Sequence, residues 1–144
     1  TRRLGMSTLR TNALEGVDAK NSITIVAGAG NITTTNVQEG LAKVTLMGGT
    51  DASRTDSFNV ASGTDNGTGD YSYGITNDMA SANYTIVGTA TNAVANDPVI
   101  SCNPSDDVTT AGSLRLQLGH TGSGTDGFAQ VDKVHYSAVF GDLA

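Results

Sequence analysis

Apolar and polar residues alternate in short runs from Leu41 to the end of the chain. A period of two places alternate side chains on one face of a strand, and one apolar face is typical of antiparallel sheets packed on one side. We therefore expect each run to turn its apolar set toward a shared core. The alternating sets are Val44 and Leu46; Phe58 and Val60; Tyr71, Tyr73 and Ile75; Leu114, Leu116 and Leu118; and Val134, Tyr136, Ala138 and Phe140.

These runs predict eight short strands, each bounded by Gly, Asn, Asp, Ser or Thr turn signals. About eight strands in about 100 residues is typical of a β-sandwich or jelly roll. We predict an all-β, antiparallel sandwich or jelly-roll-like domain over residues 41–144. The expected strands lie within 41–47, 57–62, 70–76, 83–90, 98–103, 113–120, 128–131 and 133–140.

Residues 1–40 differ from the rest of the chain because all seven aromatic residues lie after position 57. Aromatic side chains supply much of the buried area of a compact core. The first forty residues still contain strand-like pieces at 7–14, 22–27 and 31–36. We interpret residues 1–40 as a β-rich arm that oligomerises or docks, with a flexible tail as the alternative.

The glycine-rich stretch from Gly63 to Gly69 predicts a hairpin turn. Asn66-Gly67 is a strong hairpin signal, because both residues tolerate positive φ. A phosphate-binding loop would need a lysine after its last glycine and then a helix, whereas Asp70 and a strand follow here. A phosphate site is therefore excluded.

The sequence offers candidate metal ligands but no complete metal motif. Asp65, Asn66 and Asp70 carry oxygen ligands, and residues 121–129 resemble one copy of a calcium-binding repeat that normally works in stacks. EF-hand spacing is missing from both stretches, and His120 and His135 fall in different predicted strands. We predict no metal or cofactor, and a weak Ca²⁺ site at 65–70 or 121–127 stays open.

Catalytic patterns are equally weak. The adjacent carboxylates Asp106 and Asp107 would point apart on a strand or lie in a solvated turn. Cys102, the single cysteine, sits in an apolar run and is expected to be a buried, inert thiol. We predict no catalytic residue and no enzyme, although a glycosidase pair assembled from distant Asp residues is not excluded by sequence.

The charge of the chain bears on its partners. Its net charge of −6 argues against nucleic acid, and no run approaches the ~18 apolar residues of a membrane span. The charge is uneven. Residues 1–54 carry six Lys or Arg against four acidic residues, a balance of +2, whereas residues 55–144 carry two against ten, a balance of −8.

Residues 56–90, DSFNVASGTDNGTGDYSYGITNDMASANYTIVGTA, resemble a module of bacteriophage tail fibres and related virion proteins. The likeness is close at 58–60, 64–71 and 83–84. Residues 6–43 are similar to the stem that often precedes such modules, and 133–142 resemble their closing strand. The matching residues are hairpin and core positions, so the resemblance implies a fold and a virion context and carries over no chemistry.

The resemblance implies a structural virion protein, namely a homotrimeric tail fibre or spike subunit that contributes to host attachment. Residues 1–40 would then dock on other virion proteins. Loops at 62–69, 91–97, 103–112 and 119–127 would face a host glycan or protein. Two alternatives remain: a capsid head fibre or decoration protein, and a carbohydrate-binding or glycan-cleaving module.

Overall fold

The computed structural model describes residues 11, 13, 24–26, 34–36, 40–91, 109–121 and 128–144. The chain divides into two units, Thr1–Val37 and Gln38–Ala144. In the first unit, β1 (Thr24–Val26) pairs antiparallel with β2 (Thr34–Asn36). Both strands lie within runs that the sequence predicts as strand-like. The expected strand at 7–14 falls outside the described residues except for Thr11 and Ala13.

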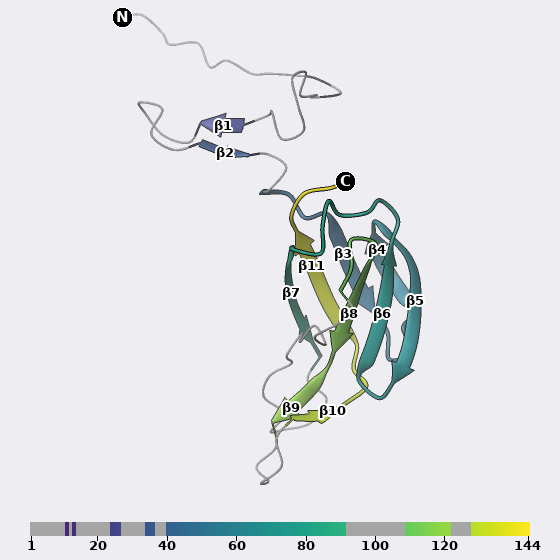
Figure 1. The fold of residues 1–144 in the computed structure, drawn as a ribbon. Coiled ribbons are helices and arrows are strands. Elements are labelled where there is room, and N and C mark those ends of the chain that lie inside the picture. Colours follow the sequence, from purple (N-terminus) through teal and green to yellow (C-terminus); the bar gives the residue numbers. More distant parts are fainter. Residues whose placement is uncertain are drawn as a thin grey trace, which may run out of the picture. The chain divides into compact units, whose positions relative to one another are not determined.

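The second unit contains two antiparallel sheets, which confirms the predicted all-β sandwich (Figure 1). One sheet has four strands in the order β4-β3-β11-β7, and the other has three in the order β5-β6-β8. The strands of the first sheet are β3 (Val44–Gly48), β4 (Arg54–Phe58), β7 (Thr85–Ala90) and β11 (His135–Phe140). Those of the second are β5 (Val60–Gly67), β6 (Asp70–Ile75) and β8 (Ser113–Gln117).

A short third ladder extends from the end of β8. Leu118 follows β8, and the chain continues as β9 (Gly119–Thr121), which pairs antiparallel with β10 (Phe128–Gln130). The predicted run 113–120 therefore forms two strands. Leu118 links them, with its amide donating to Gly69 O at 2.6 Å and its carbonyl accepting from Val131 N at 3.0 Å.

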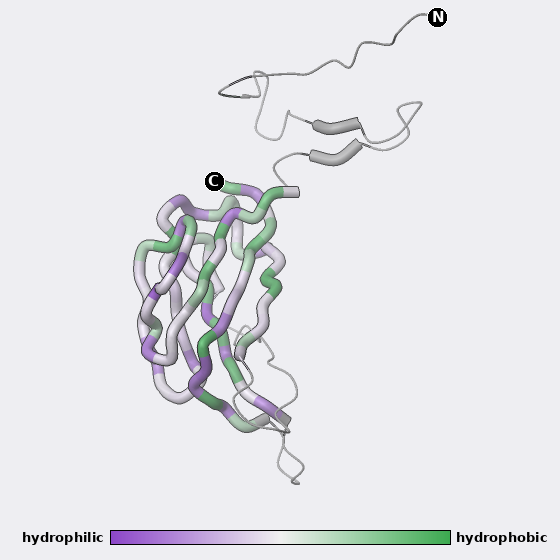
Figure 2. The backbone as a smooth tube through the Cα atoms, turned by 180° about the vertical axis from the view of Figure 1, so that it is seen from behind, coloured by the Kyte–Doolittle hydropathy of each residue, from purple (hydrophilic) through white to green (hydrophobic). Residues whose placement is uncertain are grey.

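The core lies between the two sheets, as the alternation predicts. Side chains from both sheets are fully or almost fully buried, and apolar residues recur along the strands of the four-stranded side (Figure 2). The predicted core sets of β3, β6 and β8 are confirmed. The buried apolar residues are Val44, Leu46, Ala52, Val60, Tyr71, Tyr73, Ile75, Met79, Leu114, Leu116, Leu118 and Val139.

On β11 the prediction of which face is buried is wrong. We expected Val134, Tyr136, Ala138 and Phe140 in the core, but the buried residues are His135, Ser137 and Val139. Val139 pairs with core residue Val44 of β3, and directly opposed residues share a face. The predicted alternation is present in β11, but the opposite set of side chains faces the core.

The predicted strand 57–62 is also interrupted. Asn59 has a φ of 60°, and the chain leaves the four-stranded sheet as β4 and enters the three-stranded sheet as β5. Because the strand turns at this corner, Phe58 is 60% exposed while Val60 is buried. The predicted strand at 98–103, with Cys102, lies outside the described residues.

Candidate functional site

The predicted hairpin at 63–69 is confirmed, with its turn two residues further along than the expected Asn66-Gly67. β5 runs to Gly67, which pairs with Asp70, so Thr68 and Gly69 form the tip. Gly67 and Gly69 have positive φ, and Asn66 does not. Residues 62–67 are thus strand rather than loop, which corrects the expected contact loop at 62–69.

The oxygen ligands of this hairpin are engaged in local hydrogen bonds. Asp65 Oδ1 accepts from Gly67 N at 2.9 Å. The Asn66 amide donates to Ser72 Oγ at 2.8 Å and to Asp70 Oδ1 at 3.4 Å. These contacts stabilise the irregular end of the ladder, where the register shifts between Asp65 and Gly67.

Asp70 forms an ion pair across the sheet with Arg115 of β8. Arg115 Nε donates to Asp70 Oδ1 at 2.6 Å, and a second guanidinium nitrogen donates to Oδ2. The hydrogen bond from Arg115 holds the pKa of Asp70 below its usual value, and burial opposes that shift. Both carboxylate oxygens are therefore neutralised by a fork-shaped donor rather than available to a cation.

Within the described ranges, no group of three or more His, Cys, Asp or Glu residues could hold a metal ion. Residues 122–127 of the second proposed calcium stretch lie outside the described residues, as do Asp106 and Asp107. The absence of metal, cofactor and catalytic residues stays a prediction.

The hairpin tip is fastened to the segment after β10. Gly69 N donates to Asp132 Oδ1 at 2.7 Å, and the Tyr71 hydroxyl donates to the same oxygen at 2.8 Å. These two donors lower the pKa of Asp132, while burial and the hydrogen bond to Asp132 raise the pKa of Tyr71. Sequence reasoning missed Asp132, because nothing local marks an acceptor that serves residues more than 60 positions away.

A buried polar pair joins the two sheets. Tyr73 is fully buried, and its hydroxyl lies 2.8 Å from His135 Nε2. His135 Nδ1 lies 3.0 Å from Lys133 O, which can only accept, so Nδ1 carries the proton and Nε2 accepts from Tyr73. The imidazole stacks on Tyr71 with ring centroids 4.9 Å apart.

Burial lowers the pKa of His135 and raises the pKa of Tyr73. Gly48 is packed over the pair, since a Cβ built there would lie 2.3 Å from His135 Nε2. A hydroxyl beside an imidazole could serve in catalysis, but a substrate has no access to this one. The contact between Tyr73 and His135 therefore links the two sheets structurally. His120 lies on β9 and His135 on β11, so the two histidines are on different strands, as predicted.

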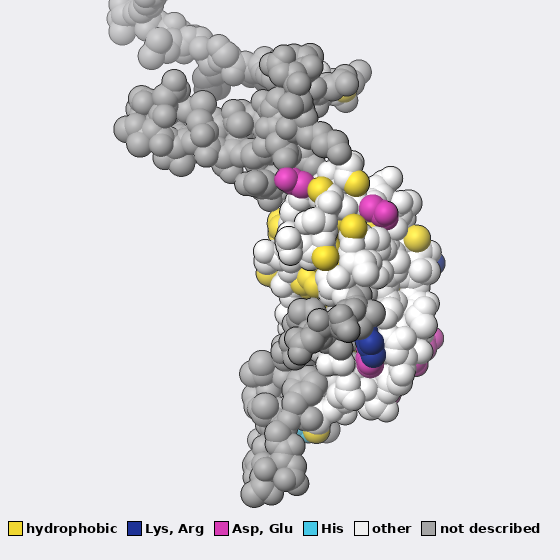
Figure 3. Space-filling model, viewed as in Figure 1, with side chains coloured by type: hydrophobic (Ala, Val, Ile, Leu, Met, Phe, Trp, Pro, Cys, Tyr) yellow, Lys and Arg dark blue, Asp and Glu magenta, His cyan; other side chains and the backbone are white. Residues whose placement is uncertain are grey.

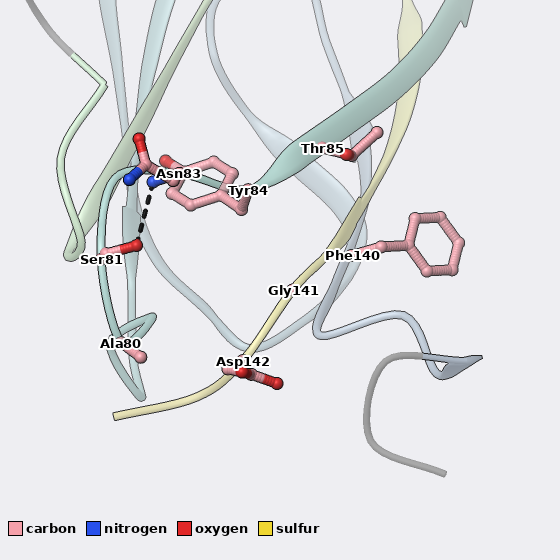
Figure 4. A pocket seen from close by; sticks show the side chains of 8 residues that line it. All are labelled: Ala80, Ser81, Asn83, Tyr84, Thr85, Phe140, Gly141 and Asp142. Atoms are coloured by element: carbon pink, nitrogen blue, oxygen red, sulfur yellow. Dashed lines mark hydrogen bonds between the residues drawn. The ribbon is translucent and has the colours of Figure 1, made fainter. Parts of the chain in front are cut away.

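An open pocket of about 350 Å³ lies beside β11 (Figure 4). Its lining includes Tyr84 and Asp142, with the Tyr84 hydroxyl donating toward Ser113 O at 2.9 Å and Thr110 O at 3.0 Å. Burial raises the pKa of Tyr84 to about 12. Asp142 is the one carboxylate of the lining, whereas glycoside hydrolysis normally needs two. The full lining is Ala80, Ser81, Asn83, Tyr84, Thr85, Phe140, Gly141 and Asp142.

Comparison of the chain with protein-family models, with curated proteins and with solved structures returned no match. Among the described residues, no helix has the length and apolar character needed to cross a membrane. The remaining expected contact loops lie partly outside the described residues. The structure describes 91, 109–112 and 119–121 of those ranges, and 119–121 form strand β9 rather than a loop.

Proposed function

We propose that this chain is a structural virion protein of a bacteriophage, a tail-fibre or spike subunit that contributes to host attachment and has no enzymatic activity. The observation that carries the proposal is the resemblance of residues 56–90 to modules of such fibres. The same residues include the corner at Asn59 and the hairpin tip at Gly69, two points at which the fold depends on particular residue types.

The positions of the polar groups support a role in recognition rather than in catalysis. Asp70, Asp132 and His135 are engaged in hydrogen bonds that hold the sheets and the hairpin together. The described pocket provides one carboxylate. A rigid sandwich with polar connections at its ends is a common scaffold for binding a surface.

The proposed assembly is a homotrimer. Residues 1–40 would act as the stem that docks on other virion proteins, and residues 41–144 would form the distal domain. Short strands without aromatic residues gain stability when several chains share them. The proposed partners are therefore two copies of the same chain, neighbouring virion proteins, and a glycan or protein of the host surface, without nucleic acid or membrane insertion.

Immunogold labelling of phage particles that carry this gene tests the proposal directly. Antibodies raised against the full chain are expected to label the tail tip, and the purified chain is expected to compete with particles for adsorption to the host. Label on the capsid would support the head-fibre or decoration alternative instead. Particles without label, or release of sugars from host glycans by the purified chain, would contradict the proposal.

A further inference from the structure

The outer face of the four-stranded sheet, which we call the apolar face, exposes apolar side chains that the core does not use. Opposed residues of neighbouring strands place Phe58, Thr45, Ala138 and Val87 in one row and Asp56, Met47, Tyr136 and Thr89 in the next. Phe58 is 60% exposed, Val87 49% and Tyr136 40%. Phe140 follows on the same face of β11, pointing away from Tyr84 (Figure 4).

The outer face of the three-stranded sheet provides an internal comparison. Its side chains are polar, and Figure 3 shows it mostly white, with a basic group beside an acidic one. The described outward-facing residues of that sheet are Ser62, Thr64, Asn66, Asp70, Ser72, Gly74, Ser113, Arg115 and Gln117. The outer face of the three-stranded sheet therefore lacks large apolar side chains, whereas that of the four-stranded sheet exposes Phe58, Val87 and Tyr136. Exposed apolar patches of this kind mark interaction surfaces.

The sequence pattern of β11 supports the same conclusion. Tyr136, Ala138 and Phe140 alternate as a core-facing set would, yet they point away from the core. Among the described residues, no strand pairs with the second edge of β7, and β7 carries no charged residue that would discourage pairing. The pattern indicates a face that becomes buried on assembly.

We propose that the apolar face is the surface through which three copies of this chain pack around their common axis. The inference rests on the proposed function, which includes the homotrimer. A second copy is the occupant that the proposed homotrimer supplies. Because each chain carries a net −6, copies repel one another, and they repel least where the contact surface holds few carboxylates. Asp56 is the one acidic residue in the two central rows of the apolar face.

The size of the face sets how strongly it can act alone. Four strands about 4.8 Å apart and about six residues long cover roughly 400 Å². A stable interface buries about 800 Å² on each partner, so the face supplies about half of what is needed. The rest of the buried area would come from the proposed arm at 1–40. The apolar face therefore contributes to trimer affinity without determining it alone.

The test compares lysine substitutions on the two outer faces in the full chain. Val87→Lys and Tyr136→Lys introduce a charge into the apolar face, and Thr64→Lys introduces the same charge at an exposed position of the three-stranded sheet. All three reduce the net negative charge equally, so general repulsion cannot explain a difference between them. Sedimentation velocity across the micromolar range measures the trimer–monomer midpoint, and circular dichroism verifies folding.

We expect each apolar-face variant to raise the midpoint concentration by about tenfold or more, because burying an ammonium group in an apolar contact is unfavourable. Thr64→Lys is expected not to raise the midpoint, because its charge lies outside the apolar face. A trimer whose midpoint the two apolar-face variants leave unchanged overturns this inference, while the virion role, which particle labelling reads independently, still stands. A monomeric parent chain overturns the inference as well. So does glycan binding that Tyr136→Lys abolishes without moving the midpoint, since it assigns the face to a sugar.

Discussion

At the scale of single residues, the contact between Tyr73 and His135 makes the stability of the fold depend on a neutral imidazole. Its neutral form accepts the Tyr73 hydroxyl, and burial lowers the pKa of His135 below the 6.5 of an exposed histidine. The unfolded chain therefore binds a proton at a higher pH than the folded one. Stability from this group is fully present above about pH 6.5 and is lost as pH falls toward the folded pKa.

We expect acidification from pH 7.5 to 5.5 to reduce the free energy of unfolding, by at most about 1.4 kcal/mol per pH unit for one proton. His135→Gln keeps an acceptor for Tyr73 but does not titrate, so it should flatten this dependence. Thermal melts at matched protein concentration measure the effect. Thr64→Ala, at an exposed position whose side chain does not titrate, is the control and should retain the parent slope. A parent whose stability does not change over this range would contradict the prediction.

The glycines of the hairpin tip predict two different costs. Gly69 has a φ of 65°, and a Cβ there would lie 2.3 Å from Leu118 O. Gly67 also has a positive φ, but nothing lies within 4 Å of a Cβ built there. Gly69→Ala combines backbone strain with a clash against fixed backbone and should cost about 3 kcal/mol.

Gly67→Ala should lower the free energy of unfolding by about 1 kcal/mol, because it introduces backbone strain without a clash. Thr68→Ala, between the two glycines, should be almost silent. Urea unfolding of the three variants gives the comparison. Equal costs at Gly67 and Gly69 would show that the contact of the tip with Leu118 is unimportant.

At the scale of elements, Asn59 is the point at which one strand of the sandwich passes to the other sheet. Its side-chain amide donates to Lys43 O at 3.0 Å and Asn77 O at 3.1 Å, and its Oδ1 accepts from Asn77 N at 2.7 Å. The residue thus combines a left-handed backbone with hydrogen bonds that join three segments. Asparagine tolerates that backbone better than most residues with a side chain.

Two substitutions separate these contributions. Asn59→Gly keeps the backbone conformation and loses the hydrogen bonds, with an expected cost of about 2 kcal/mol. Asn59→Ala loses both and should cost about 1 kcal/mol more. Chemical denaturation measures the difference. If alanine is no worse than glycine, the left-handed backbone at the corner contributes nothing.

The buried face of a strand could be predicted where only one of its two alternating sets of side chains is apolar. This holds for β6 and β8, in which the apolar set is the buried one: Tyr71 and Tyr73 in β6, and Leu114 and Leu116 in β8. The buried face of β11 could not be predicted, because a period of two shows which residues share a face without showing which face is buried. His135 enters the core because Tyr73 provides its partner, and that contact spans 62 positions.

The candidate site shows the same limit. The hairpin could be predicted from Asn66 and Gly67, since turn preference is local. Its fastening to Asp132 and the ion pair of Asp70 with Arg115 could not, because each depends on a partner brought in by strand pairing. Local chemistry therefore predicts where the chain turns, and only the assembled sheets show what the polar groups bind.

At the scale of the whole molecule, the uneven charge gives the proposed assembly a measurable dependence on salt. Residues 1–54 carry +2 and residues 55–144 carry −8. Two kinds of contact could hold copies together: residues 1–54 of one copy against the acidic residues 55–144 of another, or the apolar faces of neighbouring copies against each other. Salt weakens the first by screening attraction, and it favours the second by screening repulsion between copies of charge −6.

We expect the second effect to prevail, because the described rows that contain Phe58, Val87 and Tyr136 hold one acidic residue, Asp56. Between about 0.1 M and about 1 M NaCl the screening length falls from about 10 Å to about 3 Å. The trimer–monomer midpoint of the full chain, measured by sedimentation, should therefore fall as salt rises. Thr64→Lys should follow the parent with a smaller response, since it carries less repulsive charge. Dissociation of the parent by salt would show instead that attraction between residues 1–54 and residues 55–144 of neighbouring copies dominates, and that the apolar face contributes little to assembly.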